Sequence, residues 1–220
     1  MSIDDMTIVS PSKWLTEMAK DSFLSKYPII TLNNGVDLNT YKKVQSNFKD
    51  KYKIGNKKII LGIPKGEMKY FHELAKLISD EYIIMLVGLT KSEFKKVPPN
   101  IIPLGHMPRE EMAKIFSVAD VFVNTTLEDT FPTVNLESLA CGTPVITFNS
   151  GGSPEAIDES TGEVVGKRDM KATYDAIKRI CQNDKMSEAC IKRARTLYRS
   201  EDRFEDYLEL YKRVGGNNAS

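Results

Sequence analysis

The stretch "VFVNTTLEDTFPTVNLESLACGTPVITFN", residues 121–149, decides the fold. It opens and closes with apolar runs typical of buried strands, and an acidic loop follows the first run. Pro132 suits the first turn of a helix, because proline lacks the N–H that a first turn leaves unpaired. Gly142 ends that helix, and Pro144 prevents its continuation. The stretch therefore predicts a strand, a helix and a second strand, over 121–126, about 132–141 and 144–149.

The same alternation extends on both sides of this unit. Further apolar runs, short enough for strands, are separated by segments whose apolar residues recur with helical spacing. A strand–helix order with short connections is typical of an α/β fold with a doubly wound, Rossmann-like parallel sheet. Ligands of such sheets bind at the carboxyl ends of the strands. The remaining strands are predicted at 57–63, 82–88, 100–105 and 162–165, and Pro103 places the third of these near an edge.

Two terminal pieces fall outside the alternation. Residues 7–32 predict a separate β-α-β unit, which is small because two strands alone are marginal in water. A lysine-rich segment follows and is interpreted as a solvated linker. Near the end, a helix with acids in its first turn and bases in its last turn presents one apolar face, formed by Phe204, Tyr207, Leu208 and Tyr211. The predicted division of the chain is 1–38, 39–56, 57–200 and 201–216.

The composition restricts the function. Of 220 residues, 41% are hydrophobic and 28% are charged, with a net charge of +1, so no general attraction to nucleic acid is expected. No apolar run approaches the ~20 residues that a spanning helix needs, and the N-terminus lacks the pattern of a signal peptide. We therefore expect a cytoplasmic protein. The three cysteines have no CxxC spacing, so neither a disulfide framework nor a metal site is predicted.

The helix that begins at Pro132 carries the candidate chemistry. Free N–H groups and the helix dipole make its start an anion site, and phosphate is the usual anion. Glu137 lies ~7.5 Å further along the helix axis. Two interpretations stay open at this point: the carboxylate accepts hydrogen bonds from the hydroxyl pair of a ribose, or it is simply a half-exposed helix residue.

The acidic loop and this helix resemble a known signature. Asp129, seven intervening residues and Glu137, followed by "LACGTPVI" and "GGSPE", resemble the pattern of retaining glycosyltransferases of family 4, which have the GT-B fold. "PSKWL" and "NNGVD" (33–37) are similar to the end of that family's acceptor domain and the start of its linker. The resemblance implies the C-terminal, donor-binding domain of such an enzyme, with the β-α-β of residues 1–38 as a remnant of the acceptor domain.

The resemblance also implies roles for individual residues. Glu137 would hold the nucleotide ribose, Asp129 would contact the transferred sugar, and Lys65 would neutralise the diphosphate. Its metal-free chemistry would use oriented amides and a lysine against the charge that develops on the leaving diphosphate. The other implied positions are Phe131, Thr133 and Val134 around the helix start; Gly105, His106 and Met107 beside the base; and Gly151, Gly152 and Glu155 in the donor loop.

Four departures from the family pattern matter. The first acid is Asp129 in place of glutamate, with Glu128 beside it, and which of the two faces the sugar stays open. Pro132 stands where glycine is frequent. The loop before Lys65 is short, and no arginine occurs between residues 1 and 108, so one phosphate contact of the family is missing. The acceptor domain is nearly absent.

The resulting hypothesis is a domain that binds a nucleotide sugar, with UDP favoured over GDP, and no cofactor. The whole enzyme would transfer the sugar to a glycan or lipid-linked acceptor, with possible peripheral association with a membrane, whereas the chain alone is expected to be inactive. Two alternatives remain: a non-catalytic interaction module derived from a GT-B domain, and a sugar epimerase of GT-B shape.

Overall fold

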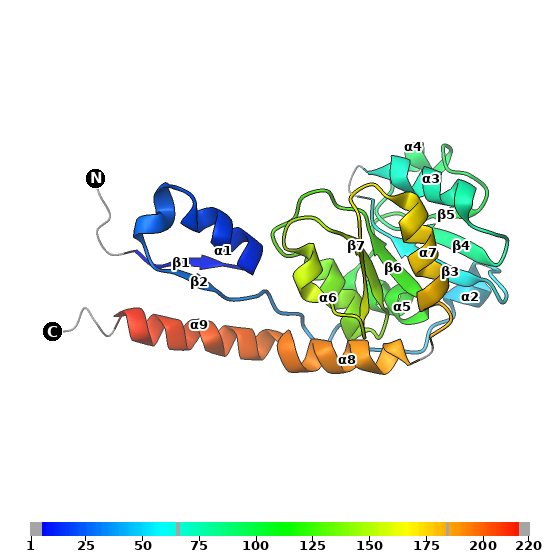
Figure 1. The fold of residues 1–220 in the computed structure, drawn as a ribbon. Coiled ribbons are helices and arrows are strands. Elements are labelled where there is room, and N and C mark those ends of the chain that lie inside the picture. Colours follow the sequence, from blue (N-terminus) through cyan, green and yellow to red (C-terminus); the bar gives the residue numbers. More distant parts are fainter. Residues whose placement is uncertain (1–5, 65–66, 184, 216–220) are drawn as a thin grey trace.

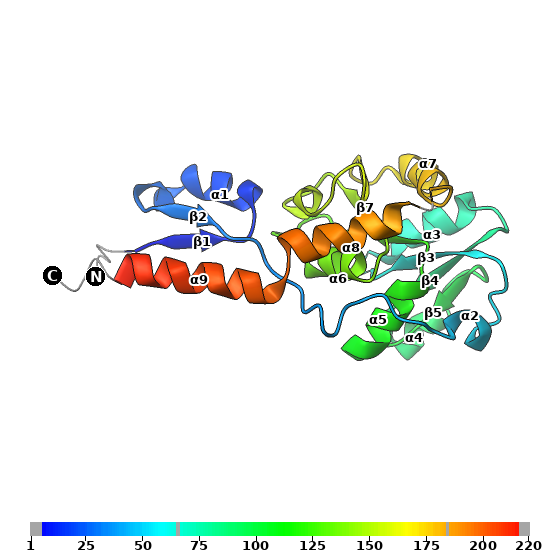
Figure 2. The ribbon, with the colours of Figure 1, turned by 90° about the horizontal axis from the view of Figure 1, so that it is seen from below.

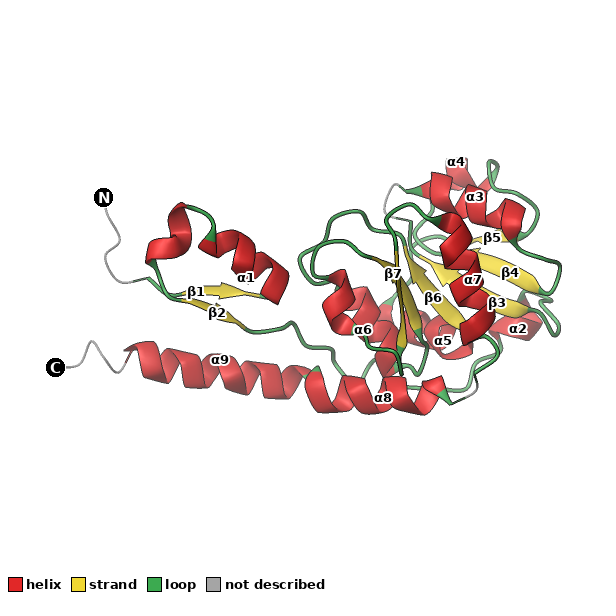
Figure 3. Ribbon diagram, in the orientation of Figure 1, coloured by secondary structure: helices red, strands yellow, loops and turns green. Residues whose placement is uncertain are grey.

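The computed structural model describes residues 6–64, 67–183 and 185–215. Its larger part is built on a six-stranded parallel sheet with the strand order β5-β4-β3-β6-β7-β8 (Figures 1 and 3). Counted from β3, this is the order 3-2-1-4-5-6 of a doubly wound sheet, so the predicted fold class is confirmed. The strands are β3 (Lys58–Gly62), β4 (Tyr82–Leu86), β5 (Ile101–Pro103), β6 (Val121–Asn124), β7 (Val145–Phe148) and β8 (Gly162–Val165).

The central strands are apolar because helices cover both faces of the sheet. Ile60 of β3 pairs with Ile84 of β4 on one side and Val121 of β6 on the other, and all three side chains are fully buried. The edge position predicted for residues 100–105 is confirmed, because β5 pairs only with β4.

Helices of the two faces belong to separate buried clusters. The helices of the sheet domain are α2 (Phe48–Lys51), α3 (Met68–Leu77), α4 (Lys91–Phe94), α5 (Arg109–Val118), α6 (Thr133–Ala140), α7 (Met170–Ile180) and α8 (Met186–Leu197). On one face α3 contacts α7, and Phe71 and Ile177 lie in the same cluster. On the other face α6 contacts both α5 and α8, around Phe116 and Leu136. The alternation of strands and helices did not predict α8, whose Cys190 and Ala194 are fully buried.

The predicted β-α-β unit at the N-terminus is confirmed. Strands β1 (Ile8–Ser10) and β2 (Ile29–Thr31) are parallel and are joined by α1 (Lys13–Lys20) and the short 3-10 helix η1 (Phe23–Lys26). The last helix, α9 (Ser200–Gly215), runs along this unit in both views (Figure 2). The loops after β6 and β7 face the same unit from the other side of a narrow waist (Figure 1).

The apolar face predicted for α9 is largely exposed. Phe204 and Tyr211 are 66% and 65% exposed, whereas Leu210 is 6% exposed and lies with Ile30 and Leu32 beside β2. The segment before the linker holds the start of the helix: the Ser200 amide donates to the Val36 carbonyl at 3.1 Å. Tight contact at Gly35, where an added Cβ would lie 2.6 Å from Ser200 Cα, fixes the helix start as well.

The interpretation of residues 39–56 as a solvated linker is only half right. Its lysines Lys42 and Lys43 are exposed, as expected. However, Tyr41, Phe48 and Ile54 are 7%, 2% and 6% exposed and belong to the core cluster beneath α5 and α6. Three buried apolar anchors therefore tie the segment to the sheet domain. In the described part of the chain, no helix has the length and apolar character needed to cross a bilayer.

Candidate functional site

The candidate site lies where the strand order of the sheet reverses. Strands β3 and β6 are neighbours, and the chain leaves them toward opposite sides of the sheet, so their carboxyl ends form the switch point at which doubly wound sheets have their ligand crevice. The acidic loop, residues 125–132, follows β6 on one side of this crevice. The other side follows β3, and Lys65 lies there outside the described residues. The topology therefore brings together the two segments that the sequence singled out separately.

Buried amides anchor α6 in this place. Asn124, the last residue of β6, donates from Nδ2 to Oδ1 of Asn135 at 2.9 Å, and both side chains are buried. Asn135 Nδ2 in turn donates to the Ser153 carbonyl at 3.4 Å. Neither residue was predicted from the sequence, although an asparagine within an apolar strand or helix is itself a signal of a buried hydrogen bond.

The start of α6 is open. Its N-cap residue is Pro132, and in the described part of the chain no side chain caps the helix at this position. The first N–H groups of a helix have no partner within the helix, and they carry its positive partial charge. Thr133, in the first turn, is exposed, and Val134 is half-buried. The start of α6 therefore lacks a side-chain cap, and the binding of an anion there stays a prediction.

The two acids of the loop differ in their surroundings. Asp129 is half-buried, its Oδ1 accepts from the Phe131 amide at 3.1 Å, and its carbonyl accepts from the Gly152 amide at 3.0 Å. Glu128 is exposed. Asp129 therefore shapes the loop, and the more exposed Glu128 stands beside it.

Phe131 belongs to the core. It is 2% exposed, and its ring lies edge-on to Tyr198 with 5.9 Å between the ring centroids. Its carbonyl accepts from Asn34 Nδ2 at 3.2 Å. This side chain fixes the loop before α6, and a direct contact of Phe131 with a substrate stays a prediction.

The glycine pair after β7 fits closely under the acidic loop. Gly151 has a φ of +58°, and a Cβ there would collide with the carbonyl of Asp129. A Cβ on Gly152 would collide with the carbonyl of Thr130 and would lie 2.7 Å from Cβ of Ser12. Only glycine leaves room for the acidic loop and for the N-terminal unit at the same time.

Glu155 binds the N-terminal unit. Its Oε2 accepts from the Lys13 amide and its Oε1 from the Trp14 amide, each at 2.8 Å, at the start of α1. Glu155 lies in the 3-10 helix η2 (Ser153–Ala156), and its carbonyl accepts from the Tyr198 hydroxyl at 3.2 Å. The carboxylate that the sequence assigned to the donor loop thus shapes that loop by joining it to α1.

Glu137 is half-buried on α6, and its carboxylate lies beside the phenol of Tyr41 from the linker. Arg109, at the start of α5, is close enough for its charge to act on the same phenol. The structure thus brings Glu137 and an arginine to the same tyrosine, and neither Tyr41 nor Arg109 was a candidate in the sequence.

The predicted base-binding residues follow β5. The Gly105 carbonyl accepts from the Gly88 amide at 3.2 Å, which joins the turns that leave β4 and β5. His106 is exposed, and Met107 is half-buried against the core. These residues lie at the carboxyl edge of the sheet, on the β3 side of the crevice. Their contact with a base stays a prediction.

Several buried hydroxyls at this edge have no hydrogen-bond partner among the described residues. They are Thr125 after β6, Thr147 in β7 and Ser153 in η2. Buried polar groups are normally paired, so these three hydroxyls distinguish this region from the apolar core around it. The carboxyl ends of β6 and β7 are therefore a polar site within an otherwise apolar sheet.

In the described ranges, no group of three or more His, Cys, Asp or Glu side chains is arranged to hold a metal ion. Cys141 and Cys190 are buried, and burial raises the pKa of each thiol to about 12. Such thiols are inert packing groups near neutral pH.

The fold and the site together define a class: a doubly wound α/β domain with an open helix start at its switch point and a carboxylate behind that start. The chain belongs to the glycosyl transferases group 1, whose family model matches residues 45–197. Its fold is the Rossmann-like fold of GT-B glycosyltransferases.

Comparisons with individual proteins agree with this family. The chain is 24% identical to the putative glycosyltransferase YtcC of Bacillus subtilis, over 88% of this chain and 56% of that protein. Its fold matches sucrose-phosphate synthase from Thermosynechococcus elongatus with a TM-score of 0.83 at 20% identity, over 96% and 59% of the two chains. It also matches Anabaena Alr3699/HepE in complex with UDP-glucose, with a TM-score of 0.79 at 14% identity, over 94% and 63%. The chain thus spans roughly three fifths of the length of these proteins.

Proposed function

We propose that this chain is the donor-binding half of a glycosyltransferase that transfers a sugar from a nucleoside diphosphate sugar with retention of the anomeric configuration. The observation that carries the proposal is the position of α6. Its uncapped start stands at the crevice between β3 and β6, and Glu137 follows within the same helix. The distance between the helix start and Glu137 along α6 is similar to the distance between the diphosphate and the ribose of a nucleotide.

In the proposed complex, the diphosphate lies at the N-terminus of α6. The amides of Thr133 and Val134 and the Lys65 ammonium stabilise the negative charge that develops as the sugar departs. Glu137 accepts hydrogen bonds from the ribose hydroxyls. Asp129 or Glu128 contacts the transferred sugar. Gly105, His106 and Met107 border the base, and the loop of Gly151, Gly152 and Glu155 closes the site from the side of β7.

We favour uridine over guanosine as the base. The Anabaena protein of similar fold binds UDP and UDP-glucose, which supports this choice. The acceptor is proposed to be a glycan or a lipid-linked sugar that the other half of the enzyme binds, with peripheral membrane association of the whole protein.

Transfer is proposed to require that other half. Much of the acceleration of a bimolecular transfer comes from holding both reactants in place and from excluding water. Residues 1–38 contribute only a small β-α-β unit to an acceptor side. The chain alone should therefore bind nucleotide without transferring sugar at a useful rate.

Isothermal titration of the purified chain with UDP and with GDP tests this function. We expect one nucleotide to bind with a Kd between micromolar and low millimolar. Glu137→Ala should weaken binding at least about fivefold, equivalent to roughly 1 kcal/mol. Glu188→Ala, which removes a carboxylate from the first turn of α8, is the matched control and should leave the Kd unchanged. Failure of both nucleotides to bind a folded chain would favour a non-catalytic interaction module.

A further inference from the structure

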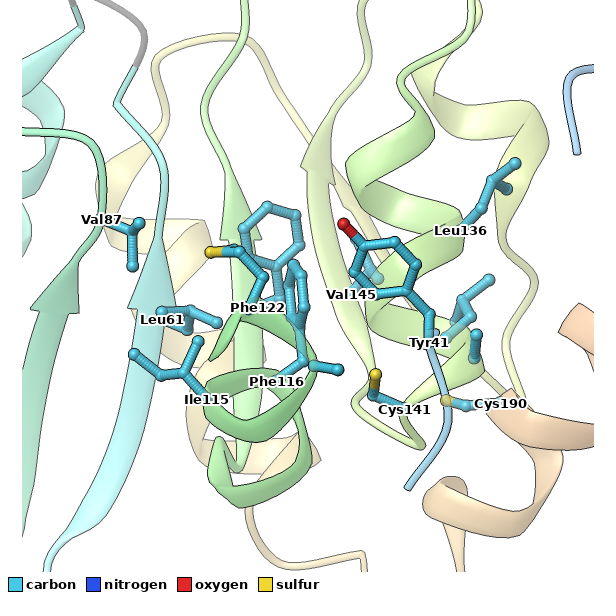
Figure 4. Close-up of a cluster of buried hydrophobic side chains, with 14 of the residues drawn as sticks. Tyr41, Leu61, Val87, Ile115, Phe116, Phe122, Leu136, Cys141, Val145 and Cys190 are labelled. Carbon is cyan, nitrogen blue, oxygen red and sulfur yellow. The ribbon is translucent and has the colours of Figure 1, made fainter. Parts of the chain in front are cut away.

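Tyr41 belongs to the segment that joins the N-terminal unit to the sheet domain, yet its ring is part of the core. It is 7% exposed and lies beside α6, in the cluster that contains Leu136 and Cys141 (Figure 4). Its hydroxyl points along the sheet toward the end at which α6 begins (Figure 4). Among residues 39–56, then, this side chain reaches toward the candidate site.

The backbone around Tyr41 is held in a fixed conformation. The Asp37 carboxylate accepts from the Asn39 amide at 2.8 Å and from Thr40 Oγ1 at 2.7 Å. The Asp37 carbonyl accepts from the Tyr41 amide, also at 2.8 Å. These bonds form a closed turn, so the direction in which the Tyr41 ring leaves the chain is determined before any ligand binds.

The Tyr41 hydroxyl lies beside the Glu137 carboxylate, within reach of a hydrogen bond to it. Burial of the phenol, together with the negative charge of Glu137, raises the pKa of Tyr41 well above its ordinary value. The hydroxyl therefore keeps its proton near neutral pH, so it is able to donate a hydrogen bond to the carboxylate.

We propose that Tyr41 is a positioning residue of the donor site, whose hydroxyl holds the Glu137 carboxylate in the orientation that accepts the two ribose hydroxyls. This inference rests on the proposed function, in which Glu137 binds the ribose. A free glutamate side chain loses rotamer freedom when it is ordered by a ligand. A carboxylate that is already oriented loses less, so the nucleotide binds more tightly.

The test compares two ligands in Tyr41→Phe, which keeps the buried ring and removes only the hydroxyl. We expect the Kd of UDP to rise about three- to tenfold, the range expected from ordering one flexible side chain. The Kd of 2′,3′-dideoxy-UDP, which lacks both ribose hydroxyls, should stay within twofold. A role in packing alone would change both affinities equally, and that outcome would overturn the proposal.

Two further variants separate the possible failures. Tyr82→Phe removes another buried phenol hydroxyl, 5% exposed in β4, and should change neither Kd. In a Glu137→Ala background, Tyr41→Phe should have no further effect on UDP. If UDP binding depends on Glu137 but not on Tyr41, only the present inference fails. If the unmodified chain binds no nucleotide, the proposed function fails and this inference fails with it.

Discussion

Helices α1 and α6 begin on facing sides of the narrow waist of the molecule, and they differ in whether the protein itself caps their N-termini. At α1, the amides of Lys13 and Trp14 donate to Glu155, and the Leu15 amide donates to Ser12 Oγ at 3.2 Å. At α6, the N-cap is Pro132, and no side chain of the described residues caps it. One helix start is satisfied within the protein, whereas the other stays open.

The difference shows that similar helix starts can take an anion from within the protein or leave its place open. Both helix starts attract anions for the same physical reason, the exposed N–H groups and the helix dipole. The chain supplies its own anion, Glu155, to α1, and thereby joins the donor loop to the N-terminal unit. At α6 the equivalent place is left for an anion from outside, which we propose to be the donor diphosphate.

Gly152 lies in close contact with the loop before α6 and with Ser12 at the start of α1. Gly152→Ala should therefore have the largest effect on stability. Its Cβ would collide with the Thr130 carbonyl and with Ser12, and backbone atoms yield less easily than a flexible side chain. We expect a loss of about 2–3 kcal/mol in the free energy of unfolding, typical of overpacking, measured by urea denaturation. Gly166→Ala, where the nearest atom lies at 3.7 Å, is the control. Equal stability of both variants would contradict the tight contact.

Thr133→Asp tests whether the open start of α6 is the place that binds a diphosphate. Thr133 is exposed in the first turn, so an added acid should leave stability unchanged or raise it slightly through the helix dipole. The same charge should repel a diphosphate and weaken UDP binding about tenfold, close to 1.4 kcal/mol. Thr133→Asn, a neutral side chain of the same shape, separates charge from size. Unchanged UDP affinity in Thr133→Asp would mean that phosphate binds elsewhere.

Glu155→Gln breaks the contact on the side of α1. One amide oxygen replaces two charged acceptors, so the Lys13 and Trp14 amides lose part of their capping. We expect about 1 kcal/mol of local destabilisation, typical of a lost N-cap, measured by faster hydrogen exchange at these two amides. Trp14 is the only tryptophan of the chain, so its fluorescence gives a second readout. Glu159→Gln, an exposed glutamate nearby, should leave both signals unchanged.

The smallest expected effect concerns Asp158 and its partner Arg193, which hold the segment that follows Glu155. Arg193 donates from Nε to the Ala156 carbonyl at 2.8 Å and also pairs with Asp158. Burial acts to raise the pKa of Asp158, but hydrogen bonds from Ser160 and Thr161 and the Arg193 charge outweigh it, so the pKa is lowered.

A lowered folded-state pKa means that Asp158 stabilises the fold above its unfolded pKa of about 3.9 and loses this contribution as pH falls through the folded value. Asp158→Asn should therefore be less stable than the parent near pH 7 and equally stable near pH 2. The difference should be a fraction of a kcal/mol, because the side chain is 47% exposed and solvent screens the pair. Thermal unfolding across this range measures it, and a difference independent of pH would contradict this account.

Features that depend on near neighbours in the chain were predictable. The apolar runs, Pro132, Gly142 and the alternation of strands and helices predicted the sheet, its edge strand and α6. The acidic loop and the glycine pair indicated the candidate site, because a turn requires particular residues wherever it occurs. Which side of α9 packs on the N-terminal unit was not predictable in this way, since the contact of Gly35 with Ser200 holds the start of the helix and no periodicity within α9 reports that contact.

The sequence by itself determined which segments become strands and helices, and at which end of the sheet the polar residues gather. It did so because periodicity, proline and glycine act within a few residues. Only the tertiary structure decided which partner each polar group takes. Glu155 meets amides 142 and 141 positions away along the chain, and Tyr41 meets Glu137 across the domain. Such pairs form only when packing brings distant segments together, and a hydrogen bond extends over about 3 Å.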